Sequence, residues 1–145
     1  MKKINNWAAE IFCRLLEKLV DRNSYLKLEL PSFEPLYLER IQENLITPFG
    51  IGEVYSLMHT YTLNGDMMRD PEMCFIVVDR RAHEKEYHRI GIYPQLFRQD
   101  NIGLYEESIL IESDEVSTIL YKTQHEHVAF ANDWLNNISD QGYLD

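Results

Sequence analysis

The dipeptide Asn64-Gly65 lies between two runs of β-forming residues, and it restricts the fold more than any other feature. Both central residues of a two-residue type I′ turn need positive φ, which asparagine and glycine adopt most readily. The sequence therefore predicts a β-hairpin with Asn64-Gly65 as its loop and with Leu63 opposite Asp66.

The pairing register of this hairpin predicts a bulge. Continued along the strands, the register places His59 opposite Asp70 and then sets apolar residues against polar ones. One extra residue near Pro71 restores the apolar pairs Leu57–Met73 and Tyr55–Phe75. Since proline cannot donate a ladder hydrogen bond, Pro71 independently favours a bulge there. We expect His59, Asp70 and Glu72 to gather at this kink.

Amphipathic periodicity predicts a helix at each end of the chain, over residues 1–23 and 123–140. Asn23-Ser24 is the expected stop of the first helix. The second helix is expected to start with a capping box, Thr123-x-x-Glu126, and to end at Gly142.

The residues between the helices, 25–121, have mostly β character. The candidate strands are 25–30, 36–41, 53–63, 73–79, 89–97 and 104–111. A short helix is the alternative for 36–41, and 116–121 is undecided between a strand and a helix that starts at Ser113-Asp114-Glu115. We predict an α+β fold, a mostly antiparallel sheet of about five strands covered by the N- and C-terminal helices. One core is expected to contain Trp7, Phe12, Phe75 and Trp134.

Composition narrows the possible functions. The 145 residues are 45% hydrophobic and carry a formal net charge of −10, which is typical of one packed domain over residues 1–145. Direct nucleic-acid binding is not expected, because phosphate contacts need clustered lysine and arginine. The longest apolar run, 73–78, is far shorter than the roughly 20 residues of a membrane helix, and Glu10, Arg14 and Glu17 interrupt any signal-peptide core. We therefore expect a cytoplasmic protein with no membrane contact.

The run from Asn64 to Met73 carries the motifs Asn-Gly-Asp and Asp-Pro-Glu-Met and is preceded by His59. With the later Phe130-Ala131-x-x-Trp134-Leu135 and Gln141-Gly142, it resembles an uncharacterised bacterial family of domains of unknown function over about residues 25–143. The resemblance implies a setting on plasmids, phages or conjugative elements. It implies no activity and no catalytic residues.

Two interpretations of the candidate motif His59, Asn64, Gly65, Asp66, Asp70, Pro71 and Glu72 remain open. Imidazole and carboxylates suit Mn²⁺, Zn²⁺ or Mg²⁺, so the motif could form a metal site. The structural interpretation is preferred: Asp66 supports the turn, and Asp70 holds the His59 ring by a hydrogen bond that raises the pKa of His59. No metal and no cofactor is predicted.

The other reactive side chains are assigned structural or solvent-exposed roles. His83 and His88 lie five residues apart, which does not fit a zinc-protease motif, so residues 80–89 are predicted to form an exposed, charged connection. His125 and His127 are expected to point to different sides. Cys13 and Cys74 are expected to be structural thiols.

We hypothesise a small non-enzymatic accessory or interaction protein of a mobile genetic element, with an unidentified protein partner. One alternative is a metal-dependent enzyme centred on His59, Asp70 and Glu72. Another is an acidic DNA mimic that inhibits a DNA-handling protein, since ten acidic residues and one basic residue follow Gln99. A mimic should carry carboxylates in two rows on one face.

Overall fold

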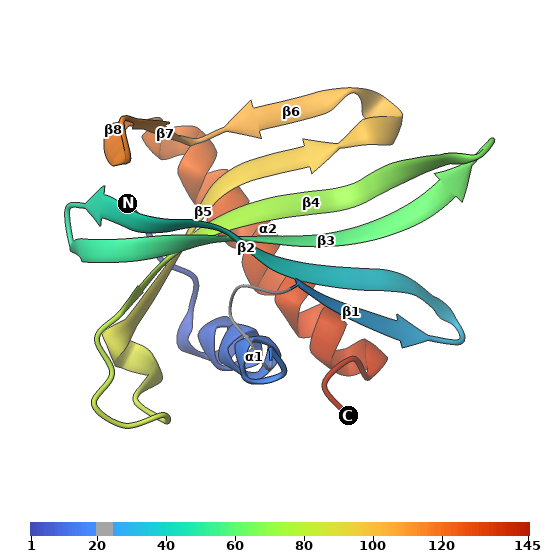
Figure 1. Cartoon of the computed structure of the whole chain (residues 1–145), viewed down its shortest axis with the longest axis horizontal. Coiled ribbons are helices and arrows are strands. Elements are labelled where there is room, and N and C mark those ends of the chain that lie inside the picture. The colour runs from blue at the N-terminus through green and yellow to red at the C-terminus, as the bar shows by residue number, and fades with distance from the viewer. Residues whose placement is uncertain (20–24) are drawn as a thin grey trace.

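The computed structural model of the chain describes residues 1–19 and 25–145. These residues form an α+β fold of two α-helices, two short 3₁₀ helices and eight strands (Figure 1). The helices are α1 (Asn6–Glu17) and α2 (Tyr121–Gln141), and the 3₁₀ helices are η1 (Tyr87–Arg89) and η2 (Asp100–Ile102). The strands are β1 (Tyr25–Leu30), β2 (Phe33–Thr47), β3 (Gly50–Leu63), β4 (Asp66–Asp79), β5 (Ile90–Gln99), β6 (Leu104–Glu107), β7 (Ile109–Glu112) and β8 (Glu115–Ile119).

The strands form one mostly antiparallel sheet in the order β6-β5-β4-β3-β2-β8-β7. β2 is long enough to pair with two strands on the same edge. Its first part pairs with β1, and Ile46 near its end pairs with Glu115 of β8 in a parallel bridge. The two ends of β2 therefore have different neighbours, and Figure 1 shows β1 and the β7–β8 hairpin at opposite sides of the view.

The sheet has a hydrophobic core on each face. On one face, side chains from α1 and α2 pack against alternate residues of the central strands, such as Tyr55 and Phe75. On the other face, the β7–β8 hairpin contributes Ile109 to a smaller core with Val54 and Ile76. As a result, every residue from Met73 to Val78 is buried.

The predicted hairpin is confirmed in detail. Asn64 and Gly65 have φ values of 52° and 85°, and Leu63 pairs with Asp66. The apolar pairs also form as predicted, namely Leu57–Met73 and Tyr55–Phe75. The bulge lies at Pro71 as predicted. Met58 pairs with Glu72 and Thr60 pairs with Arg69, which leaves the single residue His59 on β3 opposite two residues, Asp70 and Pro71, on β4.

Both terminal helices form, with boundaries that differ from the prediction. α1 starts after Asn5, whose side chain caps the helix by accepting from the Ala8 N–H at 2.8 Å, and it ends at Glu17. Residues 20–23 of the predicted helix and its predicted stop at Asn23-Ser24 lie outside the described residues. α2 starts at Tyr121 with no side-chain cap, so the predicted capping box is wrong. Its end at Gly142 is confirmed, because Gly142 adopts φ 100° and donates to the Ile138 and Ser139 carbonyls.

The predicted number of about five strands is wrong, because the part of the chain that the structure describes has eight. The segment 104–111 divides at Ser108, where the chain leaves β5 and turns to pair with β8. Ser113 and Asp114, which were expected to compete as a helix start, form the β7–β8 turn with φ values of 52° and 61°. Residues 80–89 form the predicted connection, which includes η1.

The two tryptophans occupy different environments. Trp134 is 6% exposed and belongs to the same core as Phe12 and Phe75, as predicted. Trp7 is 49% exposed, and its Nε1–H donates to Asn136 Oδ1 at 2.9 Å on the surface. Its predicted place in the core is wrong.

The N-terminal segment is held by a side chain of α2. The fully buried Gln124 accepts from the Lys2 N–H at 2.9 Å and donates to the Lys2 carbonyl at 2.7 Å and to the Pro94 carbonyl at 3.3 Å. The Ile4 N–H donates to the Ile92 carbonyl of β5 at 3.0 Å. These bonds fix the position of Lys3. Neither described helix is both long and apolar enough to span a membrane.

Candidate functional site

His59 lies across from the bulged residues Asp70 and Pro71, on the helix-covered face of the sheet. It is nine-tenths buried. Its ring contacts Trp134 edge to face at a centroid distance of 5.6 Å and Tyr143 at 5.5 Å. Three segments far apart in the sequence therefore meet around one imidazole.

The hydrogen bonding of His59 fixes its tautomer. The Trp134 indole N–H donates to His59 Nδ1 at 3.2 Å, and an indole can only donate. Nδ1 must therefore be the acceptor nitrogen, which places the hydrogen of the neutral ring on Nε2. This Nε2 is buried and has no hydrogen-bond partner among the described residues. The site thus holds a buried donor without an acceptor.

A pocket of about 260 Å³ opens beside this imidazole. We call it the His59 pocket, and its lining residues are Ser32, Phe33, Glu34, His59, Gln141 and Tyr143. The Tyr143 hydroxyl donates to the Glu34 carbonyl and ties the end of the chain to β2. Gly142 allows this contact, because its left-handed conformation turns the chain from α2 toward the sheet.

The His59 pocket has an acidic environment. Burial raises the pKa of Glu34, and the nearby charge of Asp70 raises it further. Asp70 accepts from Gln99 Nε2 at 2.9 Å, so it is held in place without a cation. Burial lowers the pKa of His59, while the charge of Asp70 acts in the opposite direction.

The predicted hydrogen bond between His59 and Asp70 is wrong, and so is the predicted rise in the pKa of His59. Asp70 pairs with Gln99, while Trp134 takes the only acceptor nitrogen of the ring. A second proton on Nδ1 would face the indole N–H, so both burial and this contact favour the neutral imidazole.

We expect His59 to make the protein less stable in acid. In the unfolded chain the His59 ring takes up a proton near pH 6.5, whereas in the folded chain it does so only at a lower pH. The stability that the neutral His59 contributes is therefore complete above about pH 6.5 and is lost as the pH falls through the folded pKa. The unfolding free energies of wild type and His59→Gln, measured by urea denaturation between pH 7.5 and 5, should therefore converge toward low pH. His83→Gln, which changes an exposed histidine, is the control. A difference between wild type and His59→Gln that does not vary with pH would contradict the assignment.

The structure separates Glu72 from His59. Glu72 faces the opposite side of the sheet, where its carboxylate accepts from Ser56 Oγ at 2.6 Å and lies 3.5 Å from Arg69 Nε. In residues 1–19 and 25–145, no group of three His, Cys, Asp or Glu side chains could hold a metal ion. The kink therefore brings His59 and Asp70 together but does not assemble the ligand set on which the metal-enzyme alternative depends.

The remaining residues of the candidate motif have local roles in the structure. Asn64 and Gly65 form the turn, Asp66 is exposed beside it, and Pro71 is buried in the bulge. Glu34 and Tyr143 were not among the predicted site residues. No sequence pattern distinguished Glu34 from the other acidic residues, whereas Gln141-Gly142 marked the segment that contains Tyr143.

A second buried histidine forms a structural link. His127 Nδ1 lies 2.9 Å from Ser108 Oγ, and its Nε2 lies 3.3 Å from Glu106 Oε1. His125 is exposed, so the two histidines do point to different sides as predicted. Serine, histidine and carboxylate are the groups of a hydrolase triad, but Ser108 is fully buried. This link joins α2 to the β6–β7 connection.

Neither cysteine has the environment of a nucleophile. Both are buried thiols. Burial, together with the nearby charge of Glu72, raises the pKa of Cys74 to about 12, so the thiol stays protonated at neutral pH.

The acidic residues after Gln99 are divided among several elements. Glu126, Asp133 and Asp140 are exposed on α2 at intervals of seven residues, which places them in one row along the helix. Glu112, Asp114 and Glu115 lie at the exposed β7–β8 turn. The helix supplies one of the two rows that a DNA mimic should have, and the mimic hypothesis stays a prediction.

Comparison with known protein families gives a match to a domain of unknown function. A family model described as Domain of unknown function (DUF6908) matches residues 10–144. Neither the curated proteins nor the solved structures contain a match to the chain.

Proposed function

The chain belongs to the DUF6908 family of domains of unknown function, and we propose that it is a non-enzymatic interaction protein that binds a protein partner at the His59 pocket. The observation that carries this proposal is the buried, unpartnered Nε2–H of His59, a residue that lines the His59 pocket. A buried donor without an acceptor costs about 1–3 kcal/mol, which a ligand that supplies an acceptor recovers on binding.

The surroundings of this donor select the ligand. The acceptor must be uncharged, because Glu34 and Asp70 repel a carboxylate or a phosphate. An amide meets this condition, since its carbonyl accepts from His59 while its N–H groups donate to carboxylates. The pocket volume of about 260 Å³ suits an Asn or Gln side chain, or a peptide group, better than a large cofactor. Phe33, at 45% exposed, offers apolar contact at the rim.

The tautomer of His59 argues against catalysis in the same pocket. Ser32 also lines the pocket, and its hydroxyl is the candidate nucleophile there because the Tyr143 hydroxyl donates to the Glu34 carbonyl. A general base must offer an unprotonated nitrogen, but Nε2 carries the hydrogen and Nδ1 accepts from Trp134. His59 therefore cannot activate Ser32 without breaking the Trp134 contact.

We further propose that the protein acts in the cytoplasm as an accessory protein of a mobile genetic element. This setting rests on the family resemblance of the His59 and Asp-Pro-Glu-Met motifs.

The test is site-specific photo-crosslinking in cells that carry the gene. A benzophenone amino acid at Phe33 should yield one defined adduct, and the same group at Ile102, which is 64% exposed in η2, should not. After identification and purification, the partner should bind the His59→Phe and Glu34→Gln variants at least tenfold more weakly than wild type. Substitution of single Asn, Gln or loop residues of the partner should then identify the residue that supplies the amide. Absence of an adduct, the same adduct from Ile102, or unchanged affinity of both variants would reject the proposal.

A further inference from the structure

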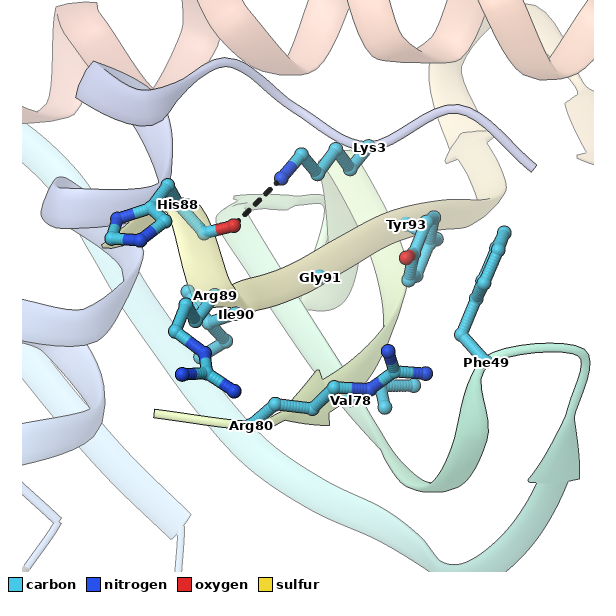
Figure 2. A pocket seen from close by; sticks show the side chains of 9 residues that line it. All are labelled: Lys3, Phe49, Val78, Arg80, His88, Arg89, Ile90, Gly91 and Tyr93. Carbon is cyan, nitrogen blue, oxygen red and sulfur yellow. Dashed lines mark hydrogen bonds between the residues drawn. The ribbon is translucent and has the colours of Figure 1, made fainter. Parts of the chain in front are cut away.

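A second pocket lies at the opposite end of β2 from the His59 pocket, beside the β2–β3 turn (Figure 2). Its volume is about 280 Å³. We call it the basic pocket, and its lining residues are Lys3, Phe49, Val78, Arg80, His88, Arg89, Ile90, Gly91 and Tyr93. None of these nine residues is acidic, although the chain carries a net charge of −10.

Three cationic side chains, Lys3, Arg80 and Arg89, line this pocket. The Lys3 ammonium donates to the His88 carbonyl at 3.1 Å, and Figure 2 shows the His88 ring pointing away. Lys3 therefore keeps two further N–H donors. The Arg89 guanidinium lies 4.0 Å from Glu86, the longest ion-pair distance in the described part of the chain. Arg80 forms no ion pair with any described residue.

The neighbouring Arg81 shows how this chain neutralises an arginine elsewhere. Its guanidinium contacts both carboxylate oxygens of Asp79, at 3.0 and 2.9 Å. Within residues 1–19 and 25–145, Arg80 and Arg89 have no such bidentate partner. Three positive charges around one pocket without an acidic lining residue give it a positive potential, which favours the binding of an anion.

An aromatic wall borders the cations. The rings of Phe49 and Tyr93 stack at a centroid distance of 5.4 Å and an interplanar angle of 12°. Gly91 makes room for Tyr93, because a Cβ at this position would lie 2.4 Å from the tyrosine hydroxyl oxygen. Burial raises the pKa of Tyr93, and the charge of Arg80 opposes this shift, which places the guanidinium near the phenol. Phe49 is 38% exposed and can receive a planar group.

We propose that the basic pocket binds the phosphate monoester of a small molecule with a planar ring, such as a mononucleotide. Guanidinium groups donate two parallel hydrogen bonds to phosphate oxygens, and the Lys3 ammonium adds a third charge. The ring of the ligand stacks against Phe49. The pocket volume lies just below the usual range of about 300–1,000 Å³ for ligand pockets, which suits a monophosphate better than a dinucleotide.

The test is isothermal titration calorimetry of the full chain at low ionic strength with AMP, inorganic phosphate and adenosine. AMP should bind, phosphate should compete with it, and adenosine should bind at least tenfold more weakly than AMP. Replacing Arg80 and Arg89 together by glutamine should weaken AMP binding at least tenfold. The double variant Arg81→Gln/Lys122→Gln, which also removes two positive charges but outside the pocket, should change it less than twofold.

A further variant tests the aromatic wall. Gly91→Ala should displace the Tyr93 ring and weaken AMP binding more than it weakens phosphate binding. Circular dichroism of each variant checks that it is folded. The proposal is overturned if AMP and phosphate do not bind, if adenosine binds as tightly as AMP, or if the double variants Arg80→Gln/Arg89→Gln and Arg81→Gln/Lys122→Gln have equal effects. Binding of an oligonucleotide without binding of AMP would also overturn it.

Discussion

Replacing Trp134 by alanine should lower the free energy of unfolding by about 3–5 kcal/mol, as for other large aromatic side chains in cores. Trp134 is 6% exposed and joins α2 to the core that also contains Phe12 and Phe75. The substitution also removes the indole N–H that donates to His59 at 3.2 Å. Both losses act on the same helix–sheet contact. Urea denaturation followed by far-UV circular dichroism measures the change.

Trp7 provides a matched control in the same chain. It is 49% exposed, so Trp7→Ala should cost about 1 kcal/mol or less, mainly through the surface hydrogen bond to Asn136. Each variant retains one tryptophan, the exposed Trp7 in Trp134→Ala and the buried Trp134 in Trp7→Ala. Iodide should therefore quench the fluorescence of Trp134→Ala much more strongly than that of Trp7→Ala. Equal destabilisation by the two substitutions, or equal quenching, would show that the helix–sheet packing is assigned wrongly.

Replacing Gln124 by leucine should lower the free energy of unfolding by about 2–4 kcal/mol. Its side chain is fully buried and pairs with both backbone polar groups of Lys2 and with the Pro94 carbonyl. Leucine has a similar volume but leaves these groups without partners, and each buried unpaired group costs about 1–3 kcal/mol. Water that reaches Lys2 limits the total. Chemical denaturation gives the stability, and amide exchange at Lys2 and Ile4 should become faster.

Gln42→Leu is the corresponding control on the surface. Gln42 makes an exposed hydrogen bond of 3.1 Å to Asp114, so its replacement should change the stability by less than about 0.5 kcal/mol. If Gln124→Leu is as mild as Gln42→Leu, the first residues of the chain are not anchored as described. Lys3 follows Lys2, so Gln124→Leu should also weaken any anion binding at the basic pocket.

The hairpin was predictable to the level of individual pairs, because its determinants are local. Asn64-Gly65 sets the turn type, and the alternation of apolar residues then admits one register with a bulge near Pro71. The two helices were predictable for a similar reason, since an apolar stripe recurs with the helical period.

The strand count was not predictable, because tertiary pairing divides a continuous β-rich segment. Residues 104–111 look like one strand, yet the Ser108 N–H donates to the Gln95 carbonyl at 2.8 Å where the chain changes partners. Trp7 was misassigned because it lies at the edge of the apolar stripe of α1, where a surface bond to Asn136 is also available.

The candidate site was predictable only in part. The register brought His59 and Asp70 together, but no local rule could show that Trp134, 75 residues away, takes the acceptor nitrogen of the ring. Glu72 was grouped with His59 because the sequence places it at the same bulge. The bulge instead leaves these two side chains on opposite faces of the sheet.

The burial of β4 on both faces has a consequence for divergence within the family. No position from Met73 to Val78 can accept a charged side chain without placing it in one core or the other. Phe33, the first residue of β2, and the turn that carries Phe49 lie at the two ends of this strand, outside this constraint. Substitutions at these positions can therefore change the lining of the two proposed binding sites while the central strands remain the same, so we expect relatives that share this sheet to differ in these linings.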